Sequence, residues 1–198
     1  MLKYENFEDL KLKSIAKNGG RVLDVGGGRP FSKSMRKYRD LFAHSDYKTV
    51  DPDISTNPDI VGDIHNLPFD DNSIDSIICR SVLQHVSSPA IAVQEMHRVL
   101  KPGGKLFLSI PFIYPYHARS SHYSDYWRFS ADAVNLLVKN FSHKETVKKG
   151  GYFLTLSFFV PGQKHIRPLL NRLAAFLDFI FHTENRTTTA GYYIFLEK

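Results

Sequence analysis

The chain has 198 residues, 42% of them hydrophobic, and carries a formal net charge of +6. This length suits one domain with a real core, so we expect a single domain spanning residues 1–198. The charge would suit an anionic partner such as nucleic acid, a nucleotide sugar or an acidic membrane surface, although many ordinary enzymes share it.

Composition excludes further classes of protein. Cys79 is the single cysteine, which rules out an intrachain disulfide framework. The N-terminal segment, residues 1–19, mixes acids and lysines without an apolar stretch, so we expect a helical segment rather than a secretory signal, and a cytoplasmic protein. The chain has no run of about 18 uninterrupted apolar residues, which disfavours a membrane-spanning helix.

From residue 21 onward, apolar strand-like runs alternate with helical stretches, a pattern typical of a mostly parallel sheet covered on both faces. The expected strands are 21–25, 47–51, 59–63, 73–81, 104–111, 151–161 and 191–198. The expected helices are 31–45, 89–100 and 130–141, the last with Ser130 as its cap. The predicted fold class is α/β, a Rossmann-like seven-stranded sheet with a helical insert, residues 162–190, between the last two strands.

Three consecutive glycines follow the first expected strand, in the sequence LDVGGGRP. Such a backbone lets a ligand approach where no Cβ intervenes, at the edge where α/β sheets bind ligands. The dinucleotide fingerprint G-x-G-x-x-G fails here because position 31 is Phe, and no P-loop signature is present. A carboxylate at the end of the second strand, Asp51, is well suited to accept hydrogen bonds from both ribose hydroxyls.

The stretches VLDVGGG, VDPD, GDIHNLPFDDNSIDSIICRSVLQHV and RVLKPGGKLFLSIP resemble, in order and spacing, the class I S-adenosylmethionine-dependent methyltransferases. The resemblance covers roughly residues 20–111 and implies S-adenosyl-L-methionine as the cofactor. The glycine loop and its acid would hold the methionine part, the acid after the second strand the ribose, and the acid of GD with its neighbour the adenine. The residues that take these roles by resemblance are Asp24, Gly26, Gly28, Asp51, Asp63 and Ile64.

By the same resemblance, the segment from Arg80 to His85 would pass beneath the transferable methyl group, and we count Arg80 among the cofactor contacts. Many family members have a third glycine where this chain has Pro30. We expect that difference to change the shape of the loop modestly, without abolishing cofactor binding.

The loop after the fifth expected strand, FIYPYHARSSHYSDYWRF, lies next to the expected methyl site. A hydroxyl acceptor benefits from a general base, and a histidine with an ordinary pKa of about 6.5 suits that role. The predicted catalytic residues are His122, Asp125 and His117, and the predicted acceptor contacts are Tyr126 and Arg128. In the alternative, the aromatic residues pin the loop to the core, and Arg128 forms a local ion pair with Asp125.

The stretch HYSDYWRFS is also similar to one in methyltransferases associated with polysaccharide and glycolipid biosynthesis, which implies a sugar-bearing hydroxyl as the acceptor. His85 could face the methyl site or cap a turn. The histidines show no metal-ligand spacing of the H-x-x-x-H kind, so we predict no metal.

The expected insert contains an amphipathic helix within residues 163–182, with lysine and arginine beside its apolar positions. It could rest on a membrane surface, bind a lipid-linked acceptor, form a homodimer face or pack on its own domain. The leading hypothesis is a methyltransferase acting on a hydroxyl of a sugar or glycolipid precursor. The alternatives are an RNA or nucleotide methyltransferase, which lacks an evident basic stripe, and an inactive cofactor-binding partner subunit.

Overall fold

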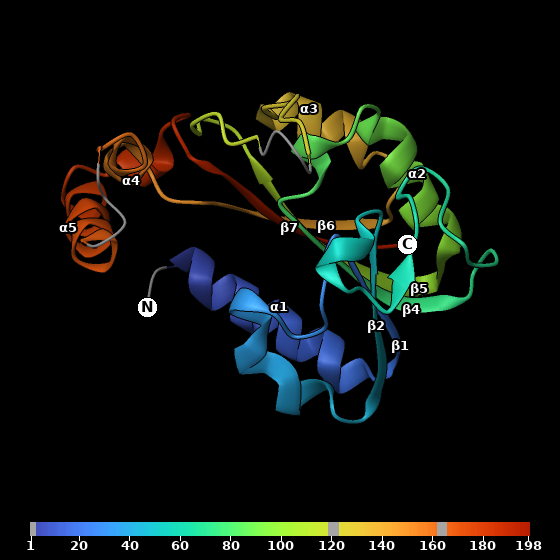
Figure 1. Ribbon diagram of the computed structural model, residues 1–198. Coiled ribbons are helices and arrows are strands. Elements are labelled where there is room, and N and C mark those ends of the chain that lie inside the picture. The colour runs from blue at the N-terminus through green and yellow to red at the C-terminus, as the bar shows by residue number, and fades with distance from the viewer. Residues whose placement is uncertain (1–2, 119–122, 162–165) are drawn as a thin grey trace.

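The computed structural model describes residues 3–118, 123–161 and 166–198 (Figure 1). Seven strands form one sheet in the order β3-β2-β1-β4-β5-β7-β6, and β7 runs antiparallel to both of its neighbours. The strands are β1 (Gly20–Val25), β2 (Ser45–Asp51), β3 (Ile60–Val61), β4 (Ile74–Arg80), β5 (Leu100–Pro111), β6 (His143–Lys148) and β7 (Gly191–Glu197). The predicted mostly parallel, seven-stranded sheet is confirmed.

Helices cover both faces of the sheet. The α-helices are α1 (Lys3–Asn18), α2 (Pro89–Val99), α3 (Ala131–Leu137), α4 (Tyr152–Ser157) and α5 (Arg167–Ile180), and the 3₁₀ helices include η1 (Lys33–Phe42), η2 (Ile54–Thr56), η3 (Leu83–His85) and η5 (Thr183–Asn185). Figure 1 shows α1 and η1 on one face and α2 and α3 on the other. Each face has its own hydrophobic cluster, the first containing Leu12 and Phe42 and the second containing Met96 and Val134.

Two sequence signals produced the elements they predicted. Ser130 caps α3, since its side chain accepts a hydrogen bond from the N–H of Ala133. α2 begins with Pro89 and buries Val93, Met96 and Val99 of its apolar stripe, whereas Ile91 is exposed. The segment 31–45 differs from expectation, because it forms the 3₁₀ helix η1 and begins only at Lys33.

The prediction of a strand over residues 151–161 is wrong. That apolar run forms the helix α4, and the missing strand is the more polar β6 at residues 143–148. A short apolar run does not distinguish strand from helix by periodicity alone. The helix is selected by Asp178 of α5, whose carboxylate accepts hydrogen bonds from the N–H groups of Gly151, Phe153 and Leu154. The helical insert between the last two strands of the chain is confirmed, but it begins before residue 162.

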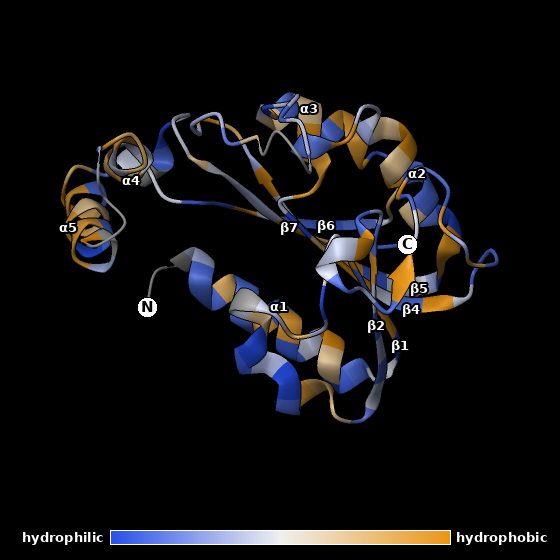
Figure 2. Cartoon of the chain, viewed as in Figure 1, coloured by the Kyte–Doolittle hydropathy of each residue, from blue (hydrophilic) through white to orange (hydrophobic). Residues whose placement is uncertain are grey.

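The insert forms a helical hairpin of α4 and α5, which we call the α4–α5 hairpin. In Figure 1 it lies away from the strands β1 to β4, at the opposite end of the molecule from the C-terminus. Figure 2 shows apolar positions on the outside of its helices as well as between them. None of the helices in the described ranges is long and apolar enough to cross a bilayer.

Candidate cofactor and acceptor sites

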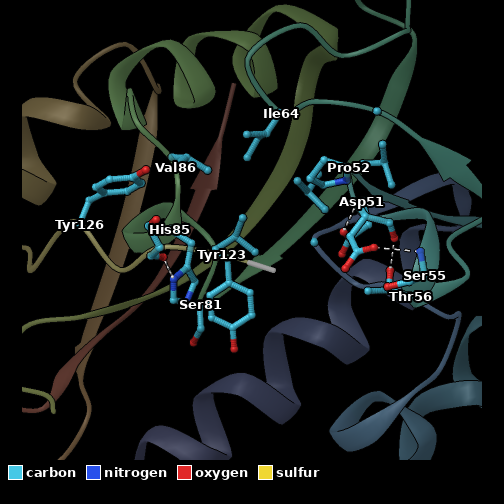
Figure 3. Close-up of a pocket in the computed structure, with 17 residues that line it drawn as sticks. Asp51, Pro52, Ser55, Thr56, Ile64, Ser81, His85, Val86, Tyr123 and Tyr126 are labelled. Carbon is cyan, nitrogen blue, oxygen red and sulfur yellow. Dashed lines mark hydrogen bonds between the residues drawn. The ribbon is translucent and has the colours of Figure 1, made fainter. Parts of the chain in front are cut away.

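The carboxyl ends of the parallel strands surround a cavity of about 670 Å³, which we call the cofactor cavity (Figure 3). Its size lies in the range of about 300 to 1,000 Å³ that small-molecule and cofactor sites occupy. It is lined by β-strand ends and the loops that follow them, including Gly26, Asp51, Gly62, Ile64, Val82 and Tyr126. Ligand binding at this edge is the general rule for open α/β sheets.

The glycine loop after β1 has the unusual backbone that its sequence predicts. Gly26 and Gly28 have φ values of 69° and 57°, in the left-handed region that favours glycine. A Cβ on Gly26 would lie 2.4 Å from Cγ2 of Val82, and a Cβ on Gly28 would lie 3.1 Å from the side chain of Thr56. Only glycine fits at Gly26 without displacing the cavity wall.

Asp51 and Ile64, the predicted ribose and adenine contacts, both line the cofactor cavity. Asp51 ends β2 and lines the cofactor cavity, and its Oδ1 accepts a hydrogen bond of 3.0 Å from the N–H of Asp53. Figure 3 shows Asp51 on one side of the cavity and Ile64 above it, facing His85 and Tyr126 across the space. A carboxylate opposite an apolar wall suits a nucleoside, with its sugar on the acid and its base on the wall.

Asp63 is oriented differently from its neighbours. Gly62 and Ile64 line the cofactor cavity, whereas the Asp63 side chain is 63% exposed and pairs with His65, at 2.7 Å from Nδ1. Hydrogen bonding from the His65 N–H lowers the pKa of the Asp63 carboxyl. In this conformation its role in adenine recognition stays a prediction.

Asp24 and Arg80 line a second cavity beside the glycine loop, which we call the glycine-loop cavity. The Asp24 carboxylate is almost fully buried and accepts a hydrogen bond from the Tyr47 hydroxyl. Burial raises the pKa of Asp24, and the positive charge of Arg80 opposes that shift. Arg80 donates to Glu8 of α1 and to the Ser34 hydroxyl, each at 3.0 Å. A buried carboxylate beside a guanidinium is a complementary setting for an amino acid's ammonium and carboxylate groups.

Three residues, Ser81, His85 and Tyr123, line both the cofactor cavity and the glycine-loop cavity. They mark the junction of the two spaces, just beyond the end of β4. A third, smaller space, which we call the acceptor cavity, opens beside them and has Ser109, Tyr114, His117 and Lys149 in its wall. A molecule in the acceptor cavity would therefore meet a ligand that spans the other two cavities close to this junction.

His117 is held in place by a buried carboxylate. Its backbone N–H donates to Oδ2 of Asp125 at 2.9 Å, and its Nδ1 lies 3.2 Å from the same oxygen and 3.2 Å from the carbonyl oxygen of Pro115. Since both neighbours of Nδ1 are acceptors, the Nδ1 atom carries the proton and the lone pair is on Nε2. His117 lines both the acceptor and the glycine-loop cavities.

Arg128 fixes Asp125 in turn. The Asp125 side chain is fully buried, and its two oxygens accept hydrogen bonds of 2.6 and 2.7 Å from the Arg128 guanidinium. These bonds lower the pKa of the Asp125 carboxyl to about 2. Arg128 also donates to the carbonyl oxygens of Tyr114 and Pro115. The Arg128–Asp125 ion pair expected in the alternative interpretation is present, and it orients His117 rather than only closing the loop.

His85 is placed beside His117 but is differently bound. Its Nδ1 lies 2.6 Å from the carbonyl oxygen of Ser124, so Nδ1 is the donor, and its Nε2 accepts from the Gln84 side-chain amide at 3.0 Å. Burial lowers the pKa of His85, which favours the neutral form of the ring. With both nitrogens occupied by protein groups, His85 forms part of the cavity wall rather than a free base.

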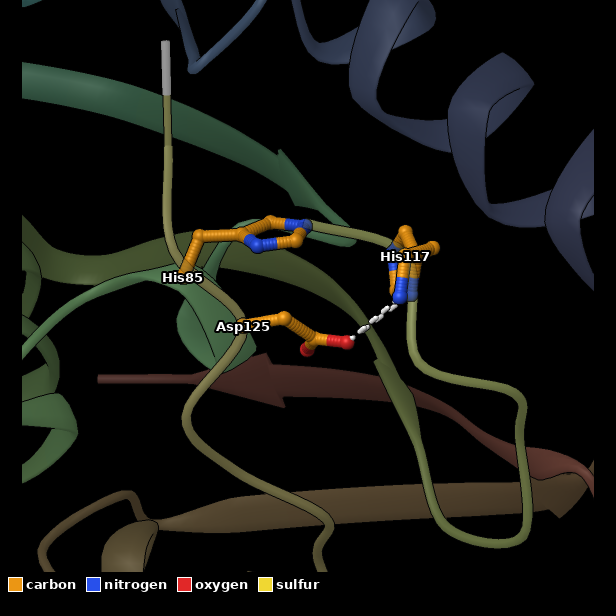
Figure 4. A group of neighbouring side chains, drawn as sticks. All are labelled: His85, His117 and Asp125. Carbon is orange, nitrogen blue, oxygen red and sulfur yellow. Dashed lines mark hydrogen bonds and ion pairs between the residues drawn. The ribbon is translucent and has the colours of Figure 1, made fainter. Parts of the chain in front are cut away.

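Figure 4 shows how closely His85, His117 and Asp125 approach one another. One ligand atom from each lies within 4.8 Å of the others, a spacing that a metal ion could bridge. Both oxygens of Asp125, however, already bind the positively charged Arg128. A cation would have to displace that pair, so the cluster is better suited to proton transfer than to metal binding.

His122, predicted as a catalytic residue, lies outside the described residues. Tyr126, predicted as an acceptor contact, lines the cofactor cavity and donates its backbone N–H to the carbonyl oxygen of Gln84. Sequence reasoning missed Tyr47 and Lys149. Tyr47 lies three positions before Val50 and is an ordinary strand residue in sequence. Lys149 directly follows the lysines of β6 and is not distinguished from them in sequence.

Comparison with known proteins agrees with this geometry. Residues 23–108 match a family model described as a methyltransferase domain. Demethylmenaquinone methyltransferase of Renibacterium salmoninarum is 39% identical over 101 residues, covering 46% of this chain and 41% of that protein. A ubiquinone/menaquinone biosynthesis C-methyltransferase of Vibrio cholerae is 28% identical over 182 residues, covering 75% of this chain and 70% of that protein. In several of the curated relatives, the Renibacterium salmoninarum enzyme among them, the match spans less than half of the relative's length.

Among solved structures, a SAM-dependent methyltransferase from Archaeoglobus fulgidus matches with a TM-score of 0.62 and 13% identity, over 99% of this chain and 100% of that one. At this identity the match concerns the fold. The fold, the order of its strands and the domain match agree with the motifs of residues 20–111. The chain therefore contains a methyltransferase domain over residues 23–108 and has the fold of the class I S-adenosylmethionine-dependent methyltransferases.

Proposed function

We propose that this protein binds S-adenosyl-L-methionine and transfers its methyl group to a hydroxyl of a small molecule, with His117 as the general base. The observation that carries the proposal is the junction of the cavities. The cofactor cavity, with Asp51 at the end of β2, meets the glycine-loop cavity at Ser81, and Ser81 and His117 both line the acceptor cavity. The fit of the cofactor rests on Asp51, Ile64 and the bare backbone of Gly26.

When bound, the cofactor supplies an electrophilic methyl group on a sulfonium, which leaves as a neutral thioether. The contributions of the chain are alignment and proton transfer. Nε2 of His117 takes the proton of the acceptor hydroxyl as the new C–O bond forms, and Asp125 stabilises the resulting imidazolium. Positioning of the two reactants can supply roughly 7 to 11 kcal/mol of the barrier.

Sugar-bearing acceptors such as nucleotide sugars or lipid-linked sugars suit the acceptor cavity. Ser109 and Tyr114 offer polar groups in its wall, and Lys149 supplies a positive charge that would attract a phosphate. The resemblance of HYSDYWRFS to methyltransferases of polysaccharide and glycolipid biosynthesis supports the same class.

A second candidate is methylation of a ring carbon next to a hydroxyl, favoured by the names of the curated quinone methyltransferases. A base that removes the hydroxyl proton would activate the neighbouring carbon, so His117 would serve both reactions. Product analysis separates them, because an O-methyl and a ring C-methyl group differ in carbon chemical shift.

The first test is calorimetric titration with S-adenosyl-L-methionine of the parent and of Asp51→Ala. We expect binding by the parent and a loss of roughly tenfold to a hundredfold in affinity in the variant, because a charge-assisted hydrogen bond contributes about 1.5 to 3 kcal/mol. Asp46→Ala is the matched control, since it removes an exposed carboxylate at the opposite end of β2 and keeps Asp51. A folded parent that does not bind the cofactor would refute the proposal.

A further inference from the structure

The α4–α5 hairpin carries an apolar surface on its outside. Along α5, Ile166, Leu169, Leu173, Phe176 and Ile180 are spaced by three or four residues, and each is between 48% and 72% exposed. Successive residues of a helix are separated by about 100°, so these side chains form one stripe. The outer side of the hairpin is therefore apolar over the whole length of α5.

This stripe is separate from the face of α5 that packs inside the hairpin. The inward face contains Ala174 and Asp178, which are buried, and Asn171 and Leu177, which are half-buried. α4 adds exposed apolar side chains of its own at Tyr152, Leu156 and Phe159. A helix that only covered its own domain would need the inward face alone, so the outer stripe requires another explanation.

The charges of the hairpin indicate what kind of surface the outer stripe binds. From residue 150 to residue 191 the sequence has four lysines and arginines against two acids, Asp178 and Glu184. Asp178 is buried and hydrogen-bonded to the start of α4, so it adds no negative charge to the surface of the hairpin. Arg172, immediately before Leu173, is exposed beside the stripe. An apolar stripe beside an exposed arginine, on a segment with more basic than acidic residues, is complementary to an anionic lipid surface.

A second copy of the chain fits less well. A two-fold symmetric interface brings the same patch of both subunits together. The α5 helix of the second copy would then offer Arg172 no acidic partner, because its one acid, Asp178, is buried. Charge therefore favours the lipid surface over self-association.

The hairpin also adjoins the acceptor cavity. Phe158, at the end of α4, packs on Tyr114 with ring centroids 5.1 Å apart, and Tyr114 packs on His117 at 5.3 Å. Lys149 lines the acceptor cavity directly before the hairpin begins. A membrane bound by the hairpin would thus lie on a part of the molecule that adjoins the acceptor cavity.

We propose that the outer stripe of the α4–α5 hairpin docks this protein on anionic membranes. The apolar side chains enter the boundary between headgroups and acyl chains, and Arg172 lies at the level of the lipid phosphates. The inference does not depend on the methyl acceptor or on catalysis by His117. It describes peripheral binding by one side of a hairpin, with the sheet remaining in water.

The test is co-sedimentation of the full chain with phosphatidylcholine vesicles that contain or lack phosphatidylglycerol. The double variant Leu169→Ser/Leu173→Ser should bind the anionic vesicles at least about tenfold more weakly, since it removes exposed apolar area without opening a core cavity. The matched control is Ile91→Ser/Leu136→Ser, which replaces exposed residues of α2 and α3 and should bind like the parent. Arg172→Gln should reduce the difference between the two vesicle types.

A parent that remains in solution with both vesicle types would overturn the proposal, as would a control variant that loses as much binding as the hairpin variant. Sedimentation velocity tests the alternative that a second copy of the chain binds the stripe. A parent that forms a dimer and does not bind vesicles, together with a monomeric Leu169→Ser/Leu173→Ser variant, would assign the stripe to self-association. Cofactor titration of the same variants should give parent-like affinity. The membrane proposal can therefore fail while cofactor binding stands.

Discussion

The cofactor half of the molecule, residues 20–111, and the acceptor half, residues 112–198, place their functional groups in different ways. In the first half each group belongs to its own strand end, as Asp51 belongs to β2. In the second half each group depends on another that lies further along the chain: His117 on Asp125, and the start of α4 on Asp178. The first arrangement is local and readable in sequence, and the second exists only after folding.

The largest expected effect concerns the acceptor half. Replacing His117 by Gln should lower turnover about 10²- to 10⁴-fold, the usual contribution of a general base, while S-adenosyl-L-methionine binds as before. Turnover is measured as formation of S-adenosylhomocysteine. The control is His85→Gln, whose ring has no free nitrogen in the structure and whose loss should cost much less. Equal losses of turnover in both variants would contradict a special role of His117 as the base and would indicate that both rings only line the cavity.

The second prediction concerns the dependence of α4 on α5. Asp178→Ala leaves three N–H groups, two of them in buried hydrogen bonds, without their acceptor, and we expect a loss of about 3 kcal/mol in the free energy of unfolding. The measurement is urea unfolding followed by circular dichroism. Asp178→Asn keeps one acceptor oxygen and should lose less. If both variants unfold like the parent, the hairpin does not depend on this contact.

The third prediction uses the pKa of Asp125, which lies at about 2 and below its ordinary value of about 3.8. A carboxyl whose pKa is lower in the folded state stabilises the fold above its unfolded pKa, and this contribution is lost as the pH falls from about 4 to about 2. The shift corresponds to about 2 kcal/mol or less. Acid unfolding of Asp125→Asn should lack this part of the pH dependence. A variant with the parent's acid profile would show that other carboxylates account for it.

The smallest effect tests the local character of the cofactor half. Gly26→Ala and Gly103→Ala both place a side chain at positive φ, at 69° and 75°, and each should cost about 1 to 2 kcal/mol of stability. Only Gly26 is crowded, by Val82, whereas a Cβ on Gly103 meets no heavy atom within 4 Å. Affinity for the cofactor should fall about tenfold in Gly26→Ala alone, as measured by calorimetry. Partial recovery in Gly26→Ala/Val82→Ala would identify the clash as the cause.

The comparison also explains which parts of the structure could be predicted. The glycine loop and the acid after β2 were predicted because each combines a buried strand with one residue type that the local backbone or ligand requires. α4 was missed because a short apolar run does not reveal Asp178, which lies more than twenty residues later. His117 and Asp125 were both singled out, but nothing local in the sequence shows that Arg128 would occupy both oxygens of the carboxylate.

The attachment of the α4–α5 hairpin has a consequence for how this protein could diversify. The insert leaves β6 and returns in β7 at neighbouring points, since Lys148 pairs with Tyr192 and the N–H of Lys149 bonds to the carbonyl oxygen of Gly191. The backbone N–H groups at the start of α4 find their acceptor within the insert, at the carboxylate of Asp178. The hairpin is thus a cassette whose length and surface can change without shifting the register of any strand. Exchanging the hairpin between related proteins could therefore change where the protein binds in the cell, while the sheet and its cofactor site stay the same.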